Sequence, residues 1–226
     1  ELKSLISKFD IGTIKMEVSR NDGPANNFLS KVRDIATKNN IVLIFDECTS
    51  GFRETFGGLH KKYSIEPDIA IFGKALGNGY AITSIIGKDI MEFAQTSFIS
   101  STFWTERIGS TAGLKTLEVM ENNETWVRIS EKGRHIKENW NKLAVKHNID
   151  LSISGLDSLC SFSIKSKNSQ KYKTFITQEM LSKGFLASDS IYVSMAHSAS
   201  IIEEYFDILD PIFKVIAECE NGRDIN

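Results

Sequence analysis

The sequence predicts an α/β fold, with a mostly parallel sheet in a large domain and a smaller C-terminal α+β domain. Two observations lead to this prediction. Unbroken aliphatic runs, of which residues 41–45 are the clearest, are typical of parallel strands buried on both faces, and in the first half they are linked by helical patterns. After about residue 150, short strands and helices succeed one another in the manner of a small α+β domain.

The elements of the first half follow from apolar spacing. A strand is expected over residues 11–18, and an amphipathic helix over 24–39 returns the chain to the strand at 41–45. Because this strand–helix–strand order implies a right-handed crossover, the two strands should be parallel. Further strands are expected at residues 67–72 and 82–87, with a short helix at 89–95.

The second half is predicted to be mainly helical around a few short strands. Helical spacing of apolar residues predicts two long helices, and shorter apolar segments predict strands between two further helices. The expected helices cover 106–122, 124–147, 172–183 and 200–219, and the expected strands cover 151–154, 159–164 and 191–193. We expect residues 1–124 to belong to the large domain and residues 125–226 to form a connecting helix and the small domain.

Composition excludes several functional classes. The 226 residues carry a net charge of −2 with a pI near 6.2, which gives no electrostatic reason to expect a nucleic-acid partner or an anionic membrane surface. No apolar stretch approaches the roughly 20 residues that span a bilayer. Cys48, Cys160 and Cys219 lack metal or disulfide spacing, which favours a reducing cytoplasm and no metal site. The chain lacks a signal peptide and an initiating methionine, and we expect it to be a fragment.

One lysine stands between an apolar segment and a glycine-rich loop. Lys74 follows the apolar residues 67–72 and precedes Gly77-Asn78-Gly79. At the inner end of a core strand its ammonium group would be desolvated, which lowers the pKa of a lysine and suits a nucleophilic amine that forms a Schiff base. The alternative is a lysine whose stem crosses apolar surface while its amine reaches water, which is the commoner arrangement.

A second motif lies at the end of the strand at residues 41–45. There Asp46-Glu47 begins the run that continues through Gly51-Phe52-Arg53. Acidic residues at the carboxyl end of a parallel strand lie where open α/β sheets bind ligands. Lys74 follows Asp46 by 28 residues, which is enough for a crossover and a return strand. A lysine and a carboxylate so placed suit pyridoxal phosphate (PLP), although a helix N-cap or turn pair is the simpler interpretation of the acids alone.

Together these motifs resemble the class III aminotransferases of the PLP-dependent fold type I superfamily, nearest to the glutamate-1-semialdehyde aminomutase branch. The resemblance covers nearly the whole chain in order. It rests on Met16-Glu17, Leu43-Ile44-Phe45-Asp46-Glu47, Gly51-Phe52-Arg53, Pro67-Asp68, Gly73-Lys74-Ala75-Leu76-Gly77-Asn78-Gly79, Ser101-Thr102-Phe103-Trp104 and Ala196-His197-Ser198.

The resemblance implies roles for four residues. Lys74 would carry the cofactor as an aldimine and then move protons, and Asp46 would pair with the pyridine nitrogen. Cys48 stands where relatives usually carry a valine against the cofactor ring, and it can fill that space as a small apolar residue; a reactive thiol is the alternative. Thr102 would bind the cofactor phosphate of the partner subunit, which implies a homodimer with its active site at the interface; alone, it would be a turn hydroxyl.

The remaining candidates receive supporting roles. Glu17 and Glu47 are expected to support the strand ends, and Arg53 either to anchor a substrate carboxylate or to form a packing or surface ion pair. Trp104 would line the substrate entrance. Among the histidines, His197 is expected to be structural, and the other three to occupy surface or helix positions without a partner: His60, His135 and His147.

The predicted activity is PLP-dependent transfer of an amino group between an amino donor and a carbonyl acceptor through a lysine aldimine. The alternative within enzymes is glutamate-1-semialdehyde 2,1-aminomutase, which moves the group within one molecule. The alternative from another class is a non-catalytic structural or binding subunit that retains the fold. The phosphate-binding loop and the ring-stacking residue of relatives precede the strand at residues 11–18 and are not identifiable here.

Overall fold

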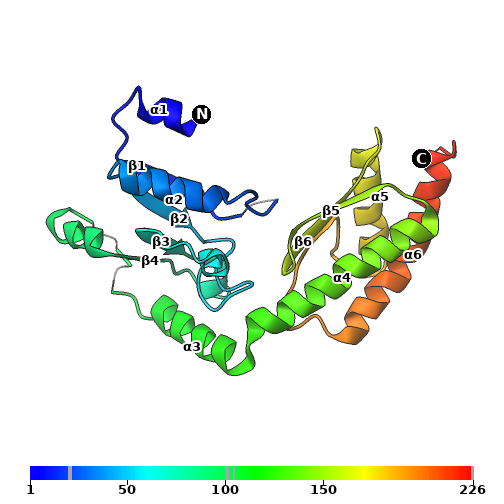
Figure 1. The fold of residues 1–226 in the computed structure, drawn as a ribbon. Coiled ribbons are helices and arrows are strands. Elements are labelled where there is room, and N and C mark those ends of the chain that lie inside the picture. The colour runs from blue at the N-terminus through cyan, green and yellow to red at the C-terminus, as the bar shows by residue number, and fades with distance from the viewer. Residues whose placement is uncertain (20–21, 100–101, 104, 225–226) are drawn as a thin grey trace. The chain divides into compact units, whose positions relative to one another are not determined.

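The computed structural model describes residues 1–19, 22–99, 102–103 and 105–224 (Figure 1). The chain forms two compact units, residues 1–126 and 127–226. Helix α4 (Thr125–His147) begins in the first unit and continues into the second. Among the described residues, no helix combines the length and the apolar character needed to cross a membrane.

The first unit is built on a four-stranded mixed sheet, in the order β1 (Thr13–Glu17), β2 (Val42–Asp46), β3 (Ile69–Phe72) and β4 (Ser84–Gly87). The first three strands are parallel, and β4 pairs antiparallel with β3. The predicted mostly parallel α/β sheet is therefore confirmed. The register sets Asp46 level with Glu17 on one side and Ile71 on the other, so three strands end at one carboxyl edge.

Helix α2 (Phe28–Lys38) lies against the sheet next to β1 and β2 (Figure 1). Its apolar residues Leu29, Val32 and Ala36 are buried, and the face of β2 that carries Leu43 and Phe45 is completely buried. The opposite face of β2 carries Ile44 and Asp46, which are only partly buried. Side chains alternate along a strand, so Asp46 belongs to the open face and its neighbour Glu47 turns toward the core.

Four short helical segments and α3 complete the described part of this unit. The helix α1 (Leu2–Ile6) and two 3₁₀ turns, η1 (Leu59–Tyr63) and η2 (Lys74–Leu76), were not predicted from the sequence. The helix expected at residues 89–95 is a 3₁₀ segment, η3 (Asp89–Thr96), and α3 covers Ile108–Asn123.

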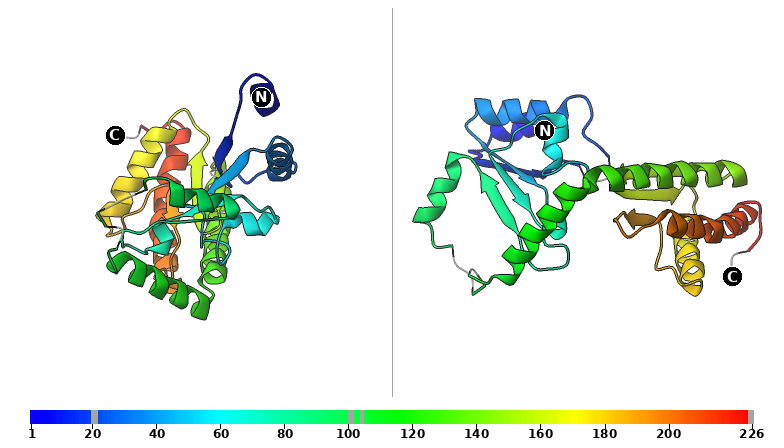
Figure 2. Two further views of the ribbon diagram at one scale, coloured as in Figure 1. Left: turned by 90° about the vertical axis from the view of Figure 1, so that its left-hand side faces the viewer. Right: turned by 90° about the horizontal axis from the view of Figure 1, so that it is seen from below.

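The second unit packs α4, α5 (Ser169–Ser182) and α6 (Ala199–Glu220) around an antiparallel sheet of β5 (Leu151–Leu156), β6 (Leu159–Ile164) and β7 (Ser190–Tyr192) (Figure 2). This α+β arrangement is the one predicted. Trp140 is buried, stacks edge-on against Phe162 and donates its indole N–H to Tyr205 at 3.0 Å. Burial raises the pKa of the Tyr205 hydroxyl, so this group remains a neutral partner of the indole.

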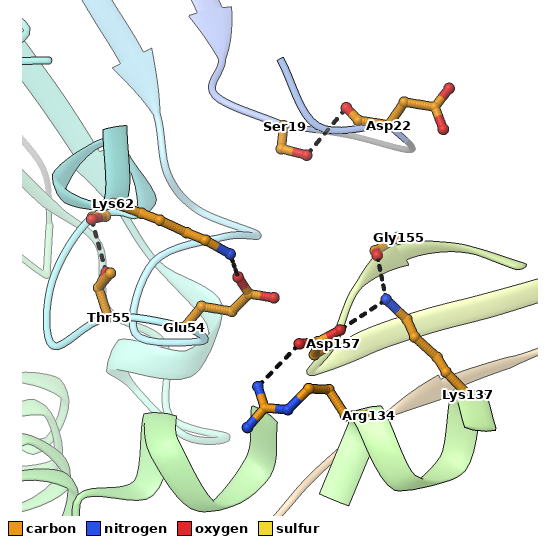
Figure 3. A network of polar contacts seen from close by, with 10 residues as sticks. Ser19, Asp22, Glu54, Thr55, Lys62, Arg134, Lys137, Gly155 and Asp157 are labelled. Carbon is orange, nitrogen blue, oxygen red and sulfur yellow. Dashed lines mark hydrogen bonds and ion pairs between the residues drawn. The ribbon is translucent and has the colours of Figure 1, made fainter. Parts of the chain in front are cut away.

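The β5–β6 turn is fixed to α4 at Gly133. A Cβ at this glycine would lie 1.7 Å from the carbonyl oxygen of Asp157, so only glycine allows the turn to approach the helix this closely. The Asp157 carboxylate accepts from Arg134 at 3.2 Å and from Lys137 at 3.0 Å (Figure 3). Backbone contact and charge together hold the small sheet on its helix.

Candidate active site

The site is built where β2 and β3 end. Asp46 is the last residue of β2, and Lys74 follows the end of β3 by two positions. Because both strands are parallel and adjacent, the two side chains belong to the same edge of the sheet. The prediction that one edge carries the lysine and the carboxylate is consistent with this register.

Lys74 donates a hydrogen bond from Nζ to Thr49 Oγ1 at 2.6 Å. Its backbone has φ +45°, in the left-handed region that a lysine rarely adopts and that is often found at functional sites. The preceding Gly73 is buried, and a Cβ there would meet Cys48 Sγ and Thr83 Cγ2 at 3.3 Å each. A side chain at position 73 would therefore press on the side chains of Cys48 and Thr83, which would have to shift slightly.

The sequence predicted a desolvated Lys74 at the inner end of a core strand, and this prediction is wrong for the described chain. The side chain of Lys74 is exposed. The reason is that Lys74 begins the turn η2, beyond the last buried strand residue, Phe72. The amine lies beside an open hollow of about 700 Å³. Its lining is Lys74, Tyr80, Ala81, Ile82, Thr83, Phe103, Glu106, Gly109 and Ser110.

Asp46 is held by two donors. Its Oδ1 accepts from the Cys48 N–H at 3.2 Å, and its Oδ2 lies 3.1 Å from Lys15 Nζ on β1. Burial raises the pKa of the Asp46 carboxyl, but the hydrogen bonds from Lys15 and Cys48 outweigh that effect and leave the pKa below its ordinary value. Asp46 is therefore an ionised carboxylate at neutral pH, with an exposed side-chain fraction of 26%.

Cys48 follows Asp46 by two residues, and its Sγ lies near Gly73, the residue before Lys74. Burial and the Asp46 carboxylate raise the pKa of its thiol, and the attraction of Lys74 and Lys15 only partly opposes this. A thiol with a raised pKa holds little thiolate at neutral pH, so the reactive-cysteine alternative loses support.

Glu47 differs from its neighbour Asp46 in its burial and in its partners. It is fully buried, accepts from the backbone N–H and the Nδ1 of His60, each at 2.9 Å, and accepts from the Ser50 hydroxyl. Burial raises the pKa of Glu47, but these donors, His60 first, lower it overall. A carboxylate that ties the loop after β2 back onto the strand matches the structural support expected of Glu47.

Three of the four histidines contradict the prediction, because His60, His135 and His147 each have a polar partner. His60 is not a surface residue without a partner, because it is buried against Glu47 and its ring lies 6.0 Å from that of Phe45. His147 is partly buried and lies 2.6 Å from Asp210. His135 is exposed on α4 and contacts Asn139. His197 accepts from the backbone N–H of Ser194 at 2.9 Å, as a structural histidine would.

The remaining predicted residues are less defined. Glu17 lies level with Asp46 at the end of β1, Arg53 is partly buried in the loop after β2, and Thr102 is exposed. Ser101 and Trp104 lie outside the described residues.

Glu106 was missed from the sequence. Its carboxylate accepts from the backbone N–H groups of Ile108 and Gly109 at 2.7 and 3.2 Å, and it caps α3 beside the hollow. A carboxylate two residues before an apolar helical pattern is the signal that could have identified it.

Two further residues that contact the predicted pair, Lys15 and Thr49, were not identified from the sequence. Lys15 stands mid-strand in a run that reads as core, and Thr49 is an ordinary loop hydroxyl. Only the pairing of β1 with β2 and the return of β3 bring them to Asp46 and Lys74, respectively. Among the described residues, no three His, Cys, Asp or Glu side chains are grouped to hold a metal ion.

Comparison with curated proteins gives similarity over most of the chain. It is 32% identical over 157 residues, 69% of its length, to 3-aminobutyryl-CoA aminotransferase of Cloacimonas acidaminovorans, of which it covers 38%. It is 30% identical over 209 residues, 84% of its length, to glutamate-1-semialdehyde 2,1-aminomutase of Hyperthermus butylicus, of which it covers 49%. The chain thus spans about half the length, or less, of these two relatives.

Solved structures share the fold at lower identity. The FumI protein of Sphingopyxis sp. MTA144, in its PLP internal aldimine form, superposes with a TM-score of 0.89 at 18% identity, over 99% of this chain and 56% of that protein. Ornithine aminotransferase of Plasmodium yoelii gives a TM-score of 0.80 at 21% identity, over 95% and 61%. The fold is therefore the fold type I architecture expected. The sequence model of the family described as "Aminotransferase class-III" matches residues 22–213, and the chain belongs to this family.

Proposed function

We propose that the protein containing this chain transfers an amino group between an amino donor and a carbonyl acceptor, with pyridoxal phosphate as cofactor. The observation that carries the proposal is the pairing of an exposed amine at Lys74 with an ionised carboxylate at Asp46 on one edge of the sheet. The relatives named above supply the family context, and their names concern amino transfer.

The residues present fit the cofactor. Pyridoxal phosphate, when bound, supplies an aldehyde that condenses with amines and a ring that accepts electrons. Lys74 is the primary amine beside the hollow, and an amine can act first as a nucleophile and later as a base. Asp46 is the acceptor for a proton held on the ring nitrogen, and its low pKa keeps it charged for that purpose. Cys48 offers a small neutral side chain next to Gly73, the residue before Lys74.

Within the chain, each neighbour of Lys74 has a definable part. Thr49 Oγ1 accepts from the amine at 2.6 Å and so directs it toward the loop after β2. The left-handed backbone at Lys74 fixes the start of its side chain at the strand end. The glutamate–histidine pair Glu47–His60 anchors the loop that carries Thr49 and Cys48, and so holds the Thr49 hydroxyl that accepts from Lys74.

The predicted homodimer belongs to the same proposal. Large apolar side chains are exposed around the hollow and in the adjoining segment of the first unit: Tyr80, Ile85, Ile86, Phe93, Phe98, Ile99, Phe103 and Ile108. Exposed apolar groups in such number mark an interaction surface. Thr102 lies in this segment, which supports its proposed role at the phosphate of a partner subunit's cofactor. The three free cysteines fit a reducing compartment and support the proposed cytoplasmic location.

The test uses the intact protein that contains this chain. Incubation with pyridoxal phosphate should give a visible absorbance band, and borohydride reduction should leave a covalent adduct that peptide mass spectrometry locates on Lys74. Lys74→Ala should abolish both. Lys74→Arg should do the same, because a guanidinium keeps the charge but is not a nucleophile at neutral pH.

Lys62→Ala is the matched control, because Lys62 is an exposed lysine of the same unit that pairs with Glu54 at 2.6 Å (Figure 3). It should leave the band and the adduct unchanged. A protein that binds the cofactor without any adduct at Lys74, or an adduct that persists in Lys74→Ala, would contradict the proposal. Failure to bind at all would favour the non-catalytic subunit.

Intramolecular transfer is the second candidate, favoured by the 30% identity to the Hyperthermus butylicus aminomutase over 84% of the chain. Requirement for a second substrate separates the two activities. An aminotransferase stops after one turnover per site when the carbonyl acceptor is withheld, whereas an aminomutase continues on a single substrate. Rapid quench with a panel of amino donors, followed by addition of the acceptor, measures this directly.

A further inference from the structure

The ion pair between Lys15 and Asp46 joins the site to a strand that the proposed chemistry does not use. Lys15 lies on β1, and its register partner on β2 is Ile44, two residues before Asp46. Lys15 and Asp46 therefore emerge on the same open face of the sheet as diagonal neighbours, and their charged atoms lie 3.1 Å apart.

This pairing uses one oxygen of the carboxylate. Oδ1 accepts from the Cys48 N–H, and Oδ2 faces Lys15 Nζ. The side chain of Lys15 is 56% exposed, so moving its ammonium group from the carboxylate into water costs little free energy. The cysteine N–H cannot leave, because it belongs to the backbone of the loop.

We propose that Lys15 is a competing cation that occupies Asp46 when the cofactor ring is absent and weakens the affinity of the site for a protonated pyridine ring. The inference rests on the proposed function, which assigns Asp46 to the ring nitrogen. A ring N–H that binds Oδ2 of Asp46 shares this oxygen with Lys15 or displaces it, and one that uses the second lone pair of Oδ1 still lies at the carboxylate that holds the ammonium group. Because the ammonium group and a protonated ring carry like charges, each disfavours the other beside one carboxylate.

Two consequences follow for the chain. With the ring absent, Lys15 keeps Asp46 ionised and oriented, so the acceptor is ready before the cofactor arrives. With the ring present, Lys15 turns to solvent or opposes the ring charge, and in either case cofactor binding loses free energy. Lys15 is thus a positioning residue that tunes cofactor retention, and it is not itself a reacting group.

The test measures the affinity of the protein for the cofactor and does not depend on catalytic activity. Cofactor-free intact protein is titrated with pyridoxal phosphate and, separately, with an analogue that carries a C–H group in place of the ring nitrogen. Lys15→Met should bind pyridoxal phosphate about two- to fivefold more tightly than the unaltered protein, the range expected for a half-exposed charge interaction. The analogue should bind both proteins equally, because it presents no N–H to Asp46.

Matched controls separate charge from packing. Lys15→Arg keeps the cation and should leave the affinity for pyridoxal phosphate within twofold of the unaltered protein. Lys88→Met removes an equally exposed lysine (58% against 56%) that lies 3.8 Å from Asp68 at the opposite edge, and it should have no effect on either ligand. Raised salt should shrink the difference between Lys15→Met and the unaltered protein.

Three results would overturn the inference. Unchanged or weaker binding of pyridoxal phosphate by Lys15→Met would show that Lys15 does not compete, and so would an equal gain for the analogue, which would mean that Lys15 acts through packing. A similar gain for Lys88→Met would reduce the effect to overall charge. Each of these can occur while the Lys74 adduct forms normally, so failure of this inference is distinct from failure of the proposed function.

Discussion

The two edges of the four-stranded sheet carry the same kinds of charged side chain and use them differently. At the amino edge, Asp68 accepts from the Leu43 N–H at 2.8 Å and from Arg33 of α2 at 2.9 Å, and Lys88 lies 3.8 Å away. At the carboxyl edge, Asp46 accepts from the Cys48 N–H and from Lys15, and Lys74 follows the end of the adjacent strand β3. Both carboxylates have lowered pKa values.

The difference lies in what the partners are attached to. Arg33 is partly buried, with 19% of its side chain exposed, and it links Asp68 to the helix that covers the sheet. Lys15 is 56% exposed and links Asp46 only to the neighbouring strand, on the open face. A carboxylate bound by a packed helix holds the fold together, whereas a carboxylate bound by a mobile, exposed side chain is free to exchange partners. The types of charged residue at a sheet edge therefore do not by themselves identify the candidate active site.

The largest expected effect comes from Asp46→Asn in the intact protein. An amide at this position accepts a ring N–H weakly and carries no charge, so we expect kcat to fall by about 10²–10³-fold, the range for loss of one preorganised electrostatic group. The free energy of unfolding should fall by about 1 kcal/mol or less, because an amide oxygen can still accept from the Cys48 N–H and the lost ion-pair partner Lys15 is exposed. Steady-state kinetics with urea unfolding of the same preparation measures both. Full activity would contradict the assignment of Asp46 to the ring.

Much of this comparison could be predicted from the sequence, and the remainder could not, for a physical reason. Asp46 and Lys74 were identified because each follows an apolar strand directly, and parallel strands bring their ends together. The partner of His60 was missed because Glu47 lies 13 residues away through a loop of no regular period. Lys15 was missed because a lysine inside a strand gives no local sign of which face is open.

The exposure of Lys74 was missed for a related reason. The apolar run before it ends in Phe72-Gly73, and hydrophobicity gives no sign that the chain turns into a left-handed residue at position 74. The positive φ is set by the short turn η2 that follows. By contrast, the core strand β6 was predicted with its correct bounds, since burial on one face gives alternating polarity along Leu159–Ile164.

The next largest effect is expected when Glu47, the acidic residue that follows Asp46, is replaced. Glu47→Gln replaces a fully buried carboxylate that three donors serve with an amide whose NH₂ group must face a donor. Breaking a buried pair by removing one partner is strongly destabilising, and we expect a loss of about 3 kcal/mol in the free energy of unfolding. The affinity for the cofactor should fall only to the extent that the lost stability loosens the loop after β2.

His60→Gln provides the matched control for that loss. A glutamine at position 60 can still donate a side-chain N–H toward Glu47, so we expect it to recover most of the stability that His60→Leu loses. Denaturant unfolding of the four proteins gives the comparison. If Glu47→Gln proved as stable as the unaltered protein, the loop after β2 would be held by its backbone alone, and the anchoring role of Glu47 would be lost.

The smallest effect is expected at the amino edge. Burial raises the pKa of Asp68, but the Leu43 N–H and Arg33, followed by Lys88, lower it below its ordinary value. A carboxyl whose folded pKa is depressed contributes stability that is present above its unfolded pKa, near 3.8, and lost as the pH falls through the folded pKa. Asp68→Asn should therefore cost about 1–2 kcal/mol at pH 7, since a side-chain hydrogen bond to a charged group is worth that much.

The same substitution should leave cofactor affinity and kcat unchanged, and the cost should shrink as the pH falls below 4, because Asp68 itself loses its charge there. Urea unfolding at a series of pH values measures this convergence. If the stability difference between Asp68→Asn and the unaltered protein stayed constant from pH 7 to pH 2, the ionised pair with Arg33 would contribute nothing. The two edges would then differ in position alone, and the contrast between a packed partner and an exposed one would have to be abandoned.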